Sequence, residues 1–275
     1  MKRATNPSSA KALPFLKWAG GKRWLADSYT HLFPMTYGHY FEAFLGSGAV
    51  FFSLRPNNAV LADVNNELIE CYSAIRDQWQ RVLAQLKIHN RQHSKQYYYA
   101  VRNSEPRLPA TRAARFIYLN RTCWNGLYRV NLKGDFNVPI GTKNNVLLDS
   151  DNFEDLSNIL RDTELVASDF EAVIERAKSG DLIFADPPYT VRHNLNGFVK
   201  YNEKIFHWDD QVRLRDCLKR ASDRGCLIFL TNANHPSIHS LYRNHFDITT
   251  LERSSVIAAK AINRGIYEEL VIKNF

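Results

Sequence analysis

The chain has 275 residues, 45% of them hydrophobic and 23% charged, as in a globular protein with one large domain or one domain with an insertion. An excess of 36 Lys and Arg over 28 Asp and Glu gives a net charge of +8, which favours a polyanionic partner. The four cysteines form no CxxC pair, and no run approaches the roughly 20 apolar residues of a membrane span, so we expect a cytoplasmic protein with no disulfide, no metal site and no membrane segment.

The amino-terminal residues are polar, and we expect a flexible tail over 1–14. The segment Lys17-Trp18-Ala19-Gly20-Gly21-Lys22 then joins an aromatic ring, flexible backbone and a cation. It lacks the GxxxxGK(S/T) spacing of a phosphate-binding loop, which makes the chain a poor candidate for an NTPase.

A glycine turn follows the first predicted strand, 39–44, and precedes a helix over 49–54. In Phe44-Leu45-Gly46-Ser47-Gly48 the glycines let the backbone turn tightly and let a ligand approach the main chain. A plain strand-to-helix turn gives the same pattern.

Acidic residues follow the next two predicted strands, 59–63 and 164–168. In Asp63-Val64-Asn65 the carboxylate can accept hydrogen bonds from ribose hydroxyls, or it can cap the helix predicted over 66–77. In Ser168-Asp169-Phe170 the acid and the ring can bind an adenine, or Asp169 can be an N-cap.

The segment 78–162 breaks the alternation of strands and helices. It is helical and basic, and it contains a predicted hairpin over 127–139 around Lys133-Gly134. Because it is too long for one crossover, we expect an inserted domain over 78–162 and a catalytic, cofactor-binding domain formed by 15–77 and 163–275. The alternative is a helical elaboration of the sheet.

Asp186-Pro187-Pro188-Tyr189 follows a short apolar strand, 182–185. Two consecutive prolines can neither continue a sheet nor enter a helix, so the chain must leave the strand in a stiff turn. That turn places a carboxylate, a proline carbonyl and an aromatic face together, which suits a planar group with an exocyclic amine. The alternative is a tight loop with Tyr189 packed on the surface.

The remaining elements complete an α/β pattern. Strands are predicted over 227–231 and 269–273, and helices over 170–178 and 210–222. Strands alternating with helices indicate a parallel sheet covered on both faces, which binds ligands beyond the carboxyl ends of its strands.

These segments together resemble the Dam family (D12 class) of DNA adenine N6-methyltransferases. The matching motifs follow the family's order and are 15–22, 41–48, Asp63-Val64-Asn65, Asn120-Arg121, 125–141, Ser168-Asp169-Phe170, Asp186-Pro187-Pro188-Tyr189, Asn263-Arg264-Gly265 and Glu268-Glu269-Leu270. The resemblance implies a Rossmann-like sheet that uses S-adenosylmethionine, and an inserted, mainly helical target-recognition domain with a β-hairpin.

The resemblance also implies a role for each motif residue. Cofactor contacts fall on Trp18, Lys22, Phe44, Gly46, Gly48, Asp63, Asn65, Asp169, Phe170 and Asp186. The residues implied to bind the target adenine are Asp186, Pro187, Pro188 and Tyr189. Lys17 and the hairpin, with Leu127, Arg129, Asn137 and Pro139, would face double-stranded DNA. Beyond the resemblance, Trp124 and Asn125 are further candidates for a DNA contact, and Arg121 suits a phosphate contact or solvent.

Within the predicted DNA-binding segment, Arg129 suits a bidentate contact to guanine and Leu127 a thymine methyl group. Trp124, with Asn125 beside it, is either a wedge that fills the gap left by a flipped base or a core aromatic. Because the hairpin resembles that of GATC-methylating members, GATC is the predicted target. The departure at Thr142 and Lys143 leaves the outer base pairs open.

Other functions remain open at this point. The same fold serves N4-cytosine, RNA adenine and protein amide acceptors, although Asp186 and the hairpin argue against them. A DNA-binding module without turnover is a further alternative. No motif indicates an obligate protein partner, and a replication and repair regulator, a restriction partner and a phage enzyme all fit.

Overall fold

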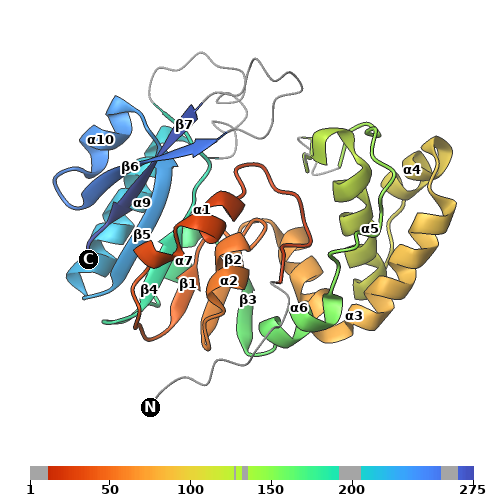
Figure 1. Ribbon diagram of the computed structural model, residues 1–275, viewed down its shortest axis with the longest axis horizontal. Helices are drawn as coiled ribbons and strands as arrows, with labels where there is room; N and C mark the ends of the chain where they lie inside the picture. Colours follow the sequence, from red (N-terminus) through yellow and green to blue (C-terminus); the bar gives the residue numbers. More distant parts are fainter. Residues whose placement is uncertain (1–11, 127, 132–135, 192–205, 255–265) are drawn as a thin grey trace. The chain divides into compact units, whose positions relative to one another are not determined.

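The computed structural model describes residues 12–126, 128–131, 136–191, 206–254 and 266–275 (Figure 1). Its strands form a seven-stranded sheet of order β3-β2-β1-β4-β5-β7-β6. The strands are β1 (Tyr40–Glu42), β2 (Ala59–Asp63), β3 (Thr163–Ala167), β4 (Leu182–Ala185), β5 (Leu227–Ala233), β6 (Asp247–Ser254) and β7 (Ile266–Lys273). The longer helical elements are α1 (Arg23–Ser28), α2 (Ala49–Leu54), α3 (Asn66–Gln92), α4 (Lys95–Arg102), α5 (Pro109–Thr122), α6 (Phe153–Leu160), α7 (Phe170–Ile174), α9 (Trp208–Asp223) and α10 (Pro236–Tyr242).

Most of the sheet is parallel. β1 pairs in parallel with β2 and β4, and β4 pairs in parallel with β5, so the carboxyl ends of these four strands lie at one edge. β7 is antiparallel to both β5 and β6. The predicted α/β fold is therefore confirmed, with an antiparallel pair at one side that the alternation of strands and helices did not predict.

By its internal contacts the chain divides into two compact units. Unit 1 comprises the chain up to Thr30, Gly46–Arg55 and Asn65–Leu165, and unit 2 comprises His31–Leu45, Pro56–Val64 and Val166–Phe275. The predicted division at residues 77 and 163 stays a prediction.

Unit 1 is built around the packing of α3 against α5. The Asn65 side chain caps α3, because its Oδ1 accepts a hydrogen bond from the Leu68 N–H at 3.1 Å. The helix was predicted to end at residue 77, and there Gln78 has non-helical backbone angles. The chain nevertheless resumes the helix and continues to Gln92.

Unit 2 holds a continuous apolar core. β4 is buried along its whole length, since every one of its residues is apolar. Helices α7 and α9 pack on each other, and α9 packs on β5 (Figure 1). On another part of this sheet Phe33 stacks on Phe229, with ring centroids 4.0 Å apart. Burial of this core holds the carboxyl end of β4 in a fixed place.

Among the helices that the structure describes, none is both long and apolar enough to cross a membrane.

Candidate active site

The turn Asp186–Tyr189 leaves β4 at the carboxyl end of the strand. Ala185, the last residue of β4, lies in register with Leu230 of β5, which places the next residue of β5, Thr231, beside Asp186. The Thr231 hydroxyl donates a hydrogen bond of 2.7 Å to Asp186 Oδ1. A buried threonine therefore sets the direction of the half-buried Asp186 carboxylate.

The Tyr189 phenol is fixed by a carboxylate from β7. Its hydroxyl donates a hydrogen bond of 2.6 Å to Glu269 Oε2. Burial, and then the nearby carboxylates of Asp186 and Glu269, raise the pKa of Tyr189 well above its usual value. The phenol therefore keeps its proton, and the hydroxyl end of its ring is anchored to β7.

A second pair of residues holds the proline part of the turn. Gln211 of α9 donates from Nε2 to the Pro188 carbonyl at 3.3 Å, and its Oε1 accepts a hydrogen bond from Asn232 Nδ2 at 3.1 Å. Both amide side chains are fully buried. Because Asn232 and Thr231 are neighbours on β5, their side chains point to opposite faces of the sheet, and the turn is held from both.

Asp169 and Phe170, predicted to bind the cofactor, lie at the start of α7. The Asp169 carboxylate caps this helix and accepts two hydrogen bonds from Arg213, at 2.7 and 2.9 Å. These bonds from Arg213 lower the pKa of Asp169. Phe170 stacks on Phe44, and the Arg213 guanidinium lies 4.2 Å from the centre of the Phe170 ring. The capping alternative for Asp169 is thus realised in this structure.

Asp63 ends β2, and its backbone carbonyl accepts a hydrogen bond from the Ser168 N–H at 3.1 Å. That bond brings the polar residue after β2 next to the residues that follow β3. The helix cap that was the alternative role of Asp63 comes from Asn65, two residues later.

In unit 1 the glycine turn packs against Trp18. Gly46 and Gly48 both have positive φ, +48° and +63°, which explains why glycine occupies these places. A Cβ on Gly46 would lie 2.8 Å from Trp18 Cδ1. The Lys22 side chain is 4% exposed, and its ammonium donates to the Gly20 carbonyl at 2.8 Å.

The residues predicted to contact DNA also lie in unit 1, and Leu127 falls outside the described residues. Trp124 is 54% exposed, which excludes the core position that was its alternative. Arg129 and Asn137 join each other, because Arg129 Nε donates to Asn137 Oδ1 at 3.3 Å. Pro139 and Asn125 are exposed.

The predicted hairpin is represented by single antiparallel bridges. Val130 pairs with Phe136, and Cys123 pairs with Ile140. Lys17 lies against the end of α5: its ammonium donates to the Arg121 carbonyl at 3.3 Å, and burial lowers its pKa. The tip at Lys133-Gly134 lies outside the described residues.

Arg121 has a structural position in unit 1 in place of the predicted DNA contact. Its side chain is 0% exposed and makes two hydrogen bonds, of 2.6 and 2.7 Å, to the Asp151 carboxylate. It also donates to the carbonyls of Phe15 and Val146. We therefore leave Arg121 out of the DNA interface.

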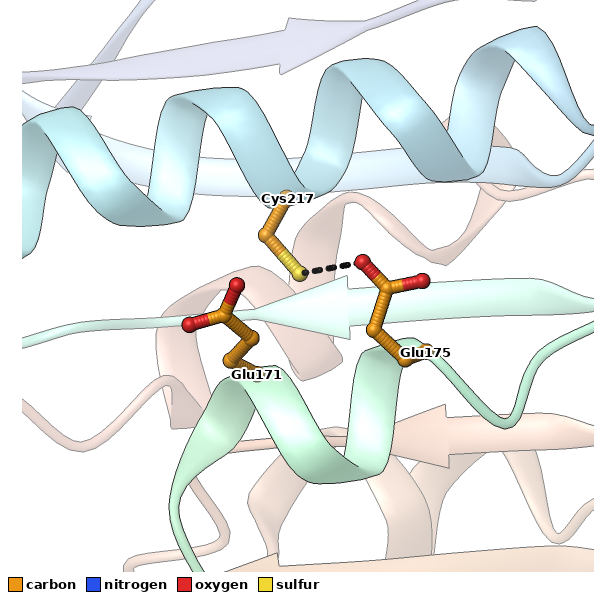
Figure 2. Close-up of side chains that lie close together, drawn as sticks. All are labelled: Glu171, Glu175 and Cys217. Carbon is orange, nitrogen blue, oxygen red and sulfur yellow. Dashed lines mark hydrogen bonds between the residues drawn. The ribbon is translucent and has the colours of Figure 1, made fainter.

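One group of potential metal ligands occurs among the described residues of unit 2. The ligand atoms of Glu171, Glu175 and Cys217 lie within 4.8 Å of one another (Figure 2). Figure 2 shows the Cys217 thiol directed at Glu175, to which it donates at 3.9 Å. Burial raises the pKa of this thiol to about 12, so it stays protonated.

The two acids of this group already have cationic partners. Arg220 contacts both Glu171 and Glu175 at 2.7 Å, and Arg224 contacts Glu175 at 2.6 Å. We therefore assign the group to an ion-pair network that joins α7 to α9.

Known proteins similar to the chain identify its family. The family model of D12 class N6 adenine-specific DNA methyltransferases matches residues 18–257. The chain belongs to this family. The methyltransferase is 38% identical over 271 residues to the Type II methyltransferase M1.LlaDCHI of Lactococcus lactis subsp. cremoris, with 95% of each chain covered.

More distant relatives cover the methyltransferase to a similar extent. The Type II methyltransferase M.MjaIII of Methanocaldococcus jannaschii is 32% identical, with 94% of this chain and 98% of the relative covered. The DNA adenine methylase of Vibrio cholerae is 28% identical, with 95% of each covered. The chain is thus an adenine-specific DNA methyltransferase, as the ordered motifs predicted.

Sequence reasoning missed the residues that hold the turn of this methyltransferase. These residues are Thr231 and Asn232 of β5 and Gln211 of α9. Both elements were predicted from their apolar residues alone, so their polar side chains were given no role. The signal was a run of polar residues at the carboxyl end of β5, and a glutamate, Glu269, directly before the apolar residues 270–272 of β7.

Proposed function

We propose that the turn Asp186–Tyr189 holds an adenine rotated out of double-stranded DNA while its N6 amine receives a methyl group from S-adenosylmethionine. The observation that carries this proposal is the fixed geometry of the turn. The Asp186 carboxylate and the Tyr189 phenol each have a hydrogen-bond partner, at 2.7 and 2.6 Å, at the carboxyl end of a central strand. Sheets of this kind bind ligands at that edge.

The chemistry follows from the weakness of the acceptor. The lone pair of the adenine amine is delocalised into the ring, and the base lies in a stacked duplex, so extrusion costs roughly a few kcal/mol. The Asp186 carboxylate and the Pro187 carbonyl accept hydrogen bonds from the amine and localise its lone pair. S-adenosylmethionine supplies the methyl group, on a positively charged sulfur.

Positive charge develops on the amine nitrogen during the transfer. The Asp186 carboxylate and the face of the Tyr189 ring stabilise that charge more than they stabilise the neutral substrate, which lowers the barrier. The nitrogen–methyl bond forms as the sulfur–methyl bond of S-adenosylmethionine breaks, which leaves S-adenosylhomocysteine. The methylated amine then releases its extra proton to water, so no general base has to act first.

For the cofactor, unit 2 offers acceptors and a ring after two neighbouring strands of the sheet, β2 and β3. Asp63, at the end of β2, suits ribose hydroxyls, and Asp169 and Phe170, after β3, suit the adenine part. Binding there requires Arg213 to release the Asp169 carboxylate or to share it. The contacts predicted for Trp18, Lys22, Asn65 and the glycine turn stay predictions.

For the DNA, unit 1 offers an exposed segment after α5. We propose that Trp124 fills the gap left by the extruded base, with Asn125 beside it, because its ring is exposed and therefore available. Arg129 would read a guanine, and Lys17, Asn137 and Pro139 would line the same interface.

The transfer is tested with the Asp186→Ala variant. We expect no N6-methyladenine in duplex DNA after incubation with labelled S-adenosylmethionine and digestion to nucleosides, while DNA affinity stays within about twofold of the wild type. The matched control is Asp223→Ala, which removes an exposed carboxylate at the end of α9 and should transfer normally. A parallel loss of DNA affinity would mean that Asp186 is structural.

Base rotation and target sequence need separate measurements. With 2-aminopurine in place of the target adenine, binding of the protein should raise the fluorescence, because the base leaves the stack. DNA from a methylation-free host that expresses the chain should carry N6-methyladenine within GATC. Methylation in another sequence would refute GATC and leave the transfer intact.

A further inference from the structure

The catalytic turn is held by two buried polar residues on one face of the sheet, Thr231 of β5 and Glu269 of β7. We propose that both are positioning residues for methyl transfer: Thr231 orients the Asp186 carboxylate, and Glu269 orients and polarises the Tyr189 ring. This inference rests on the proposed function of the turn.

The register of the sheet explains why these two residues reach the turn. Glu269 is paired with Ala233 and Val271 with Thr231, in the antiparallel ladder between β5 and β7. Paired residues point to the same face, as do residues two apart on one strand, so Thr231 and Glu269 share a face. That face also receives Asp186 and Tyr189, since each makes its hydrogen bond there.

The burial of Glu269 requires an explanation that folding alone does not supply. Its exposed fraction is 5%, and it lies in a strand whose following residues are apolar core. A carboxylate in such a place loses hydration, and it is tolerated when hydrogen-bond donors compensate. The Tyr189 hydroxyl, at 2.6 Å, is one such donor, and it belongs to the proposed catalytic turn.

The Glu269 contact changes what the Tyr189 ring can do. A phenol that donates to a carboxylate gains electron density, and a more electron-rich ring face stabilises a nearby cation more strongly. The amine nitrogen becomes cationic during the transfer, so the benefit is present in the transition state and absent in the ground state. The contact also anchors the hydroxyl end of the ring beside β7.

Thr231 acts on the other half of the turn. Its hydroxyl has 0% exposure and donates to one oxygen of Asp186, which fixes the plane of the carboxylate. A carboxylate held in one plane loses little rotational entropy when it accepts the hydrogen bond from the amine. This smaller loss is the gain in free energy expected from a preorganised acceptor.

The test of Glu269 is a double-mutant cycle with Tyr189. We expect Glu269→Gln, which keeps the shape and removes the charge, to lower the single-turnover rate of methyl transfer about tenfold. Affinities for duplex DNA and for S-adenosylmethionine, and the unfolding midpoint, should stay near the wild type. In a Tyr189→Phe background, which keeps the ring and lacks the hydroxyl, the same change should lower the rate less than about twofold.

Glu268→Gln is the matched control, because it removes an adjacent, exposed carboxylate of β7 that bonds Asn234. It should transfer at the wild-type rate. For Thr231, we expect Thr231→Val to lower the single-turnover rate about tenfold and Thr231→Ser, which keeps the hydroxyl, to restore it to within about threefold.

The outcomes separate this inference from the function on which it rests. A Glu269→Gln variant that transfers at the wild-type rate, or one whose loss is the same in the Tyr189→Phe background, overturns the role of Glu269. Thr231→Val at full rate overturns the role of Thr231. A wild-type protein that forms no N6-methyladenine overturns the proposed function and the inference together.

Discussion

At single positions in this chain, the residue type is limited by close packing of a neighbouring side chain on the backbone as well as by the chemistry of the site. Gly46 is an example. It was predicted to let a ligand approach the backbone, but in the structure the neighbouring Trp18 side chain already leaves no room for a Cβ. Its φ of +48° is left-handed, and a Cβ would lie 2.8 Å from Trp18 Cδ1 and 3.2 Å from Trp18 Nε1. The glycine therefore lets the turn pack directly on the indole ring.

We expect Gly46→Ala to lower the free energy of unfolding by about 2–4 kcal/mol, from left-handed strain plus overpacking against Trp18. Gly180→Ala is the matched control, because Gly180 has φ +83° but no atom within 4 Å of the added Cβ. It should cost only the strain, about 1–2 kcal/mol. Denaturation followed by circular dichroism measures both, and equal losses would show that Trp18 moves aside without cost.

At this scale the sequence predicted the catalytic turn but not its partners. Two consecutive prolines impose a stiff turn through local steric clashes. The turn can therefore be predicted from the four residues Asp186–Tyr189 alone. Thr231 and Glu269 contact that turn from 45 and 80 positions away. Such contacts depend on strand register, and register is decided by the whole sheet.

A buried guanidinium joins one helix of unit 1, α5, to two segments outside the helices and strands. Arg121, near the end of α5, links this helix to the Phe15 carbonyl and to the Asp151 carboxylate. An arginine in a basic, aromatic segment is typical of a nucleic-acid contact, and its own surroundings in the sequence do not reveal Asp151, 30 positions later.

We expect Arg121→Met to destabilise the protein by about 3–5 kcal/mol, because it leaves the Asp151 carboxylate buried without its cation. Arg112→Met on the same helix is the control. Arg112 is 43% exposed and pairs with the exposed Glu70, so its loss should cost about 1 kcal/mol or less. Urea denaturation compares the two. Unchanged stability with weakened DNA binding would return Arg121 to the interface.

Element bounds were predicted best where burial is continuous. β2, β4 and α2 begin and end as the apolar runs indicated. β6 was missed because it is an edge strand with only two apolar residues, Ile248 and Leu251, and its pairing with β7 defines it. α3 was predicted to be short because the interruption at Gln78 falls where its apolar pattern changes.

The stability of the whole molecule should depend on pH through a buried histidine. His89 of α3 lies against Tyr118, with ring centroids 4.8 Å apart, and its Nδ1 lies 2.9 Å from the Tyr97 hydroxyl. Burial lowers the pKa of His89 from 6.5 to about 4. The folded protein thus holds His89 neutral where the unfolded chain protonates it.

We expect this contribution to stability to be complete above pH 6.5 and to be lost as the pH falls toward 4, because the unfolded state then binds the extra proton. In His89→Phe, which keeps an aromatic ring against Tyr118, the unfolding midpoint should fall less steeply between pH 6.5 and 5. Calorimetry of both proteins across this range measures the difference, and parallel curves would contradict the assignment.

The placement of β7 between β5 and β6 affects how the enzyme is made. Along the chain β7 follows β6, yet in the sheet it separates β6 from β5. While a ribosome has not yet released residues 266–273, β5 therefore has an open edge and Tyr189 lacks Glu269. A fragment that lacks β7 would leave the edge of β5 unpaired and the turn without Glu269, so we expect it to aggregate and to transfer no methyl group.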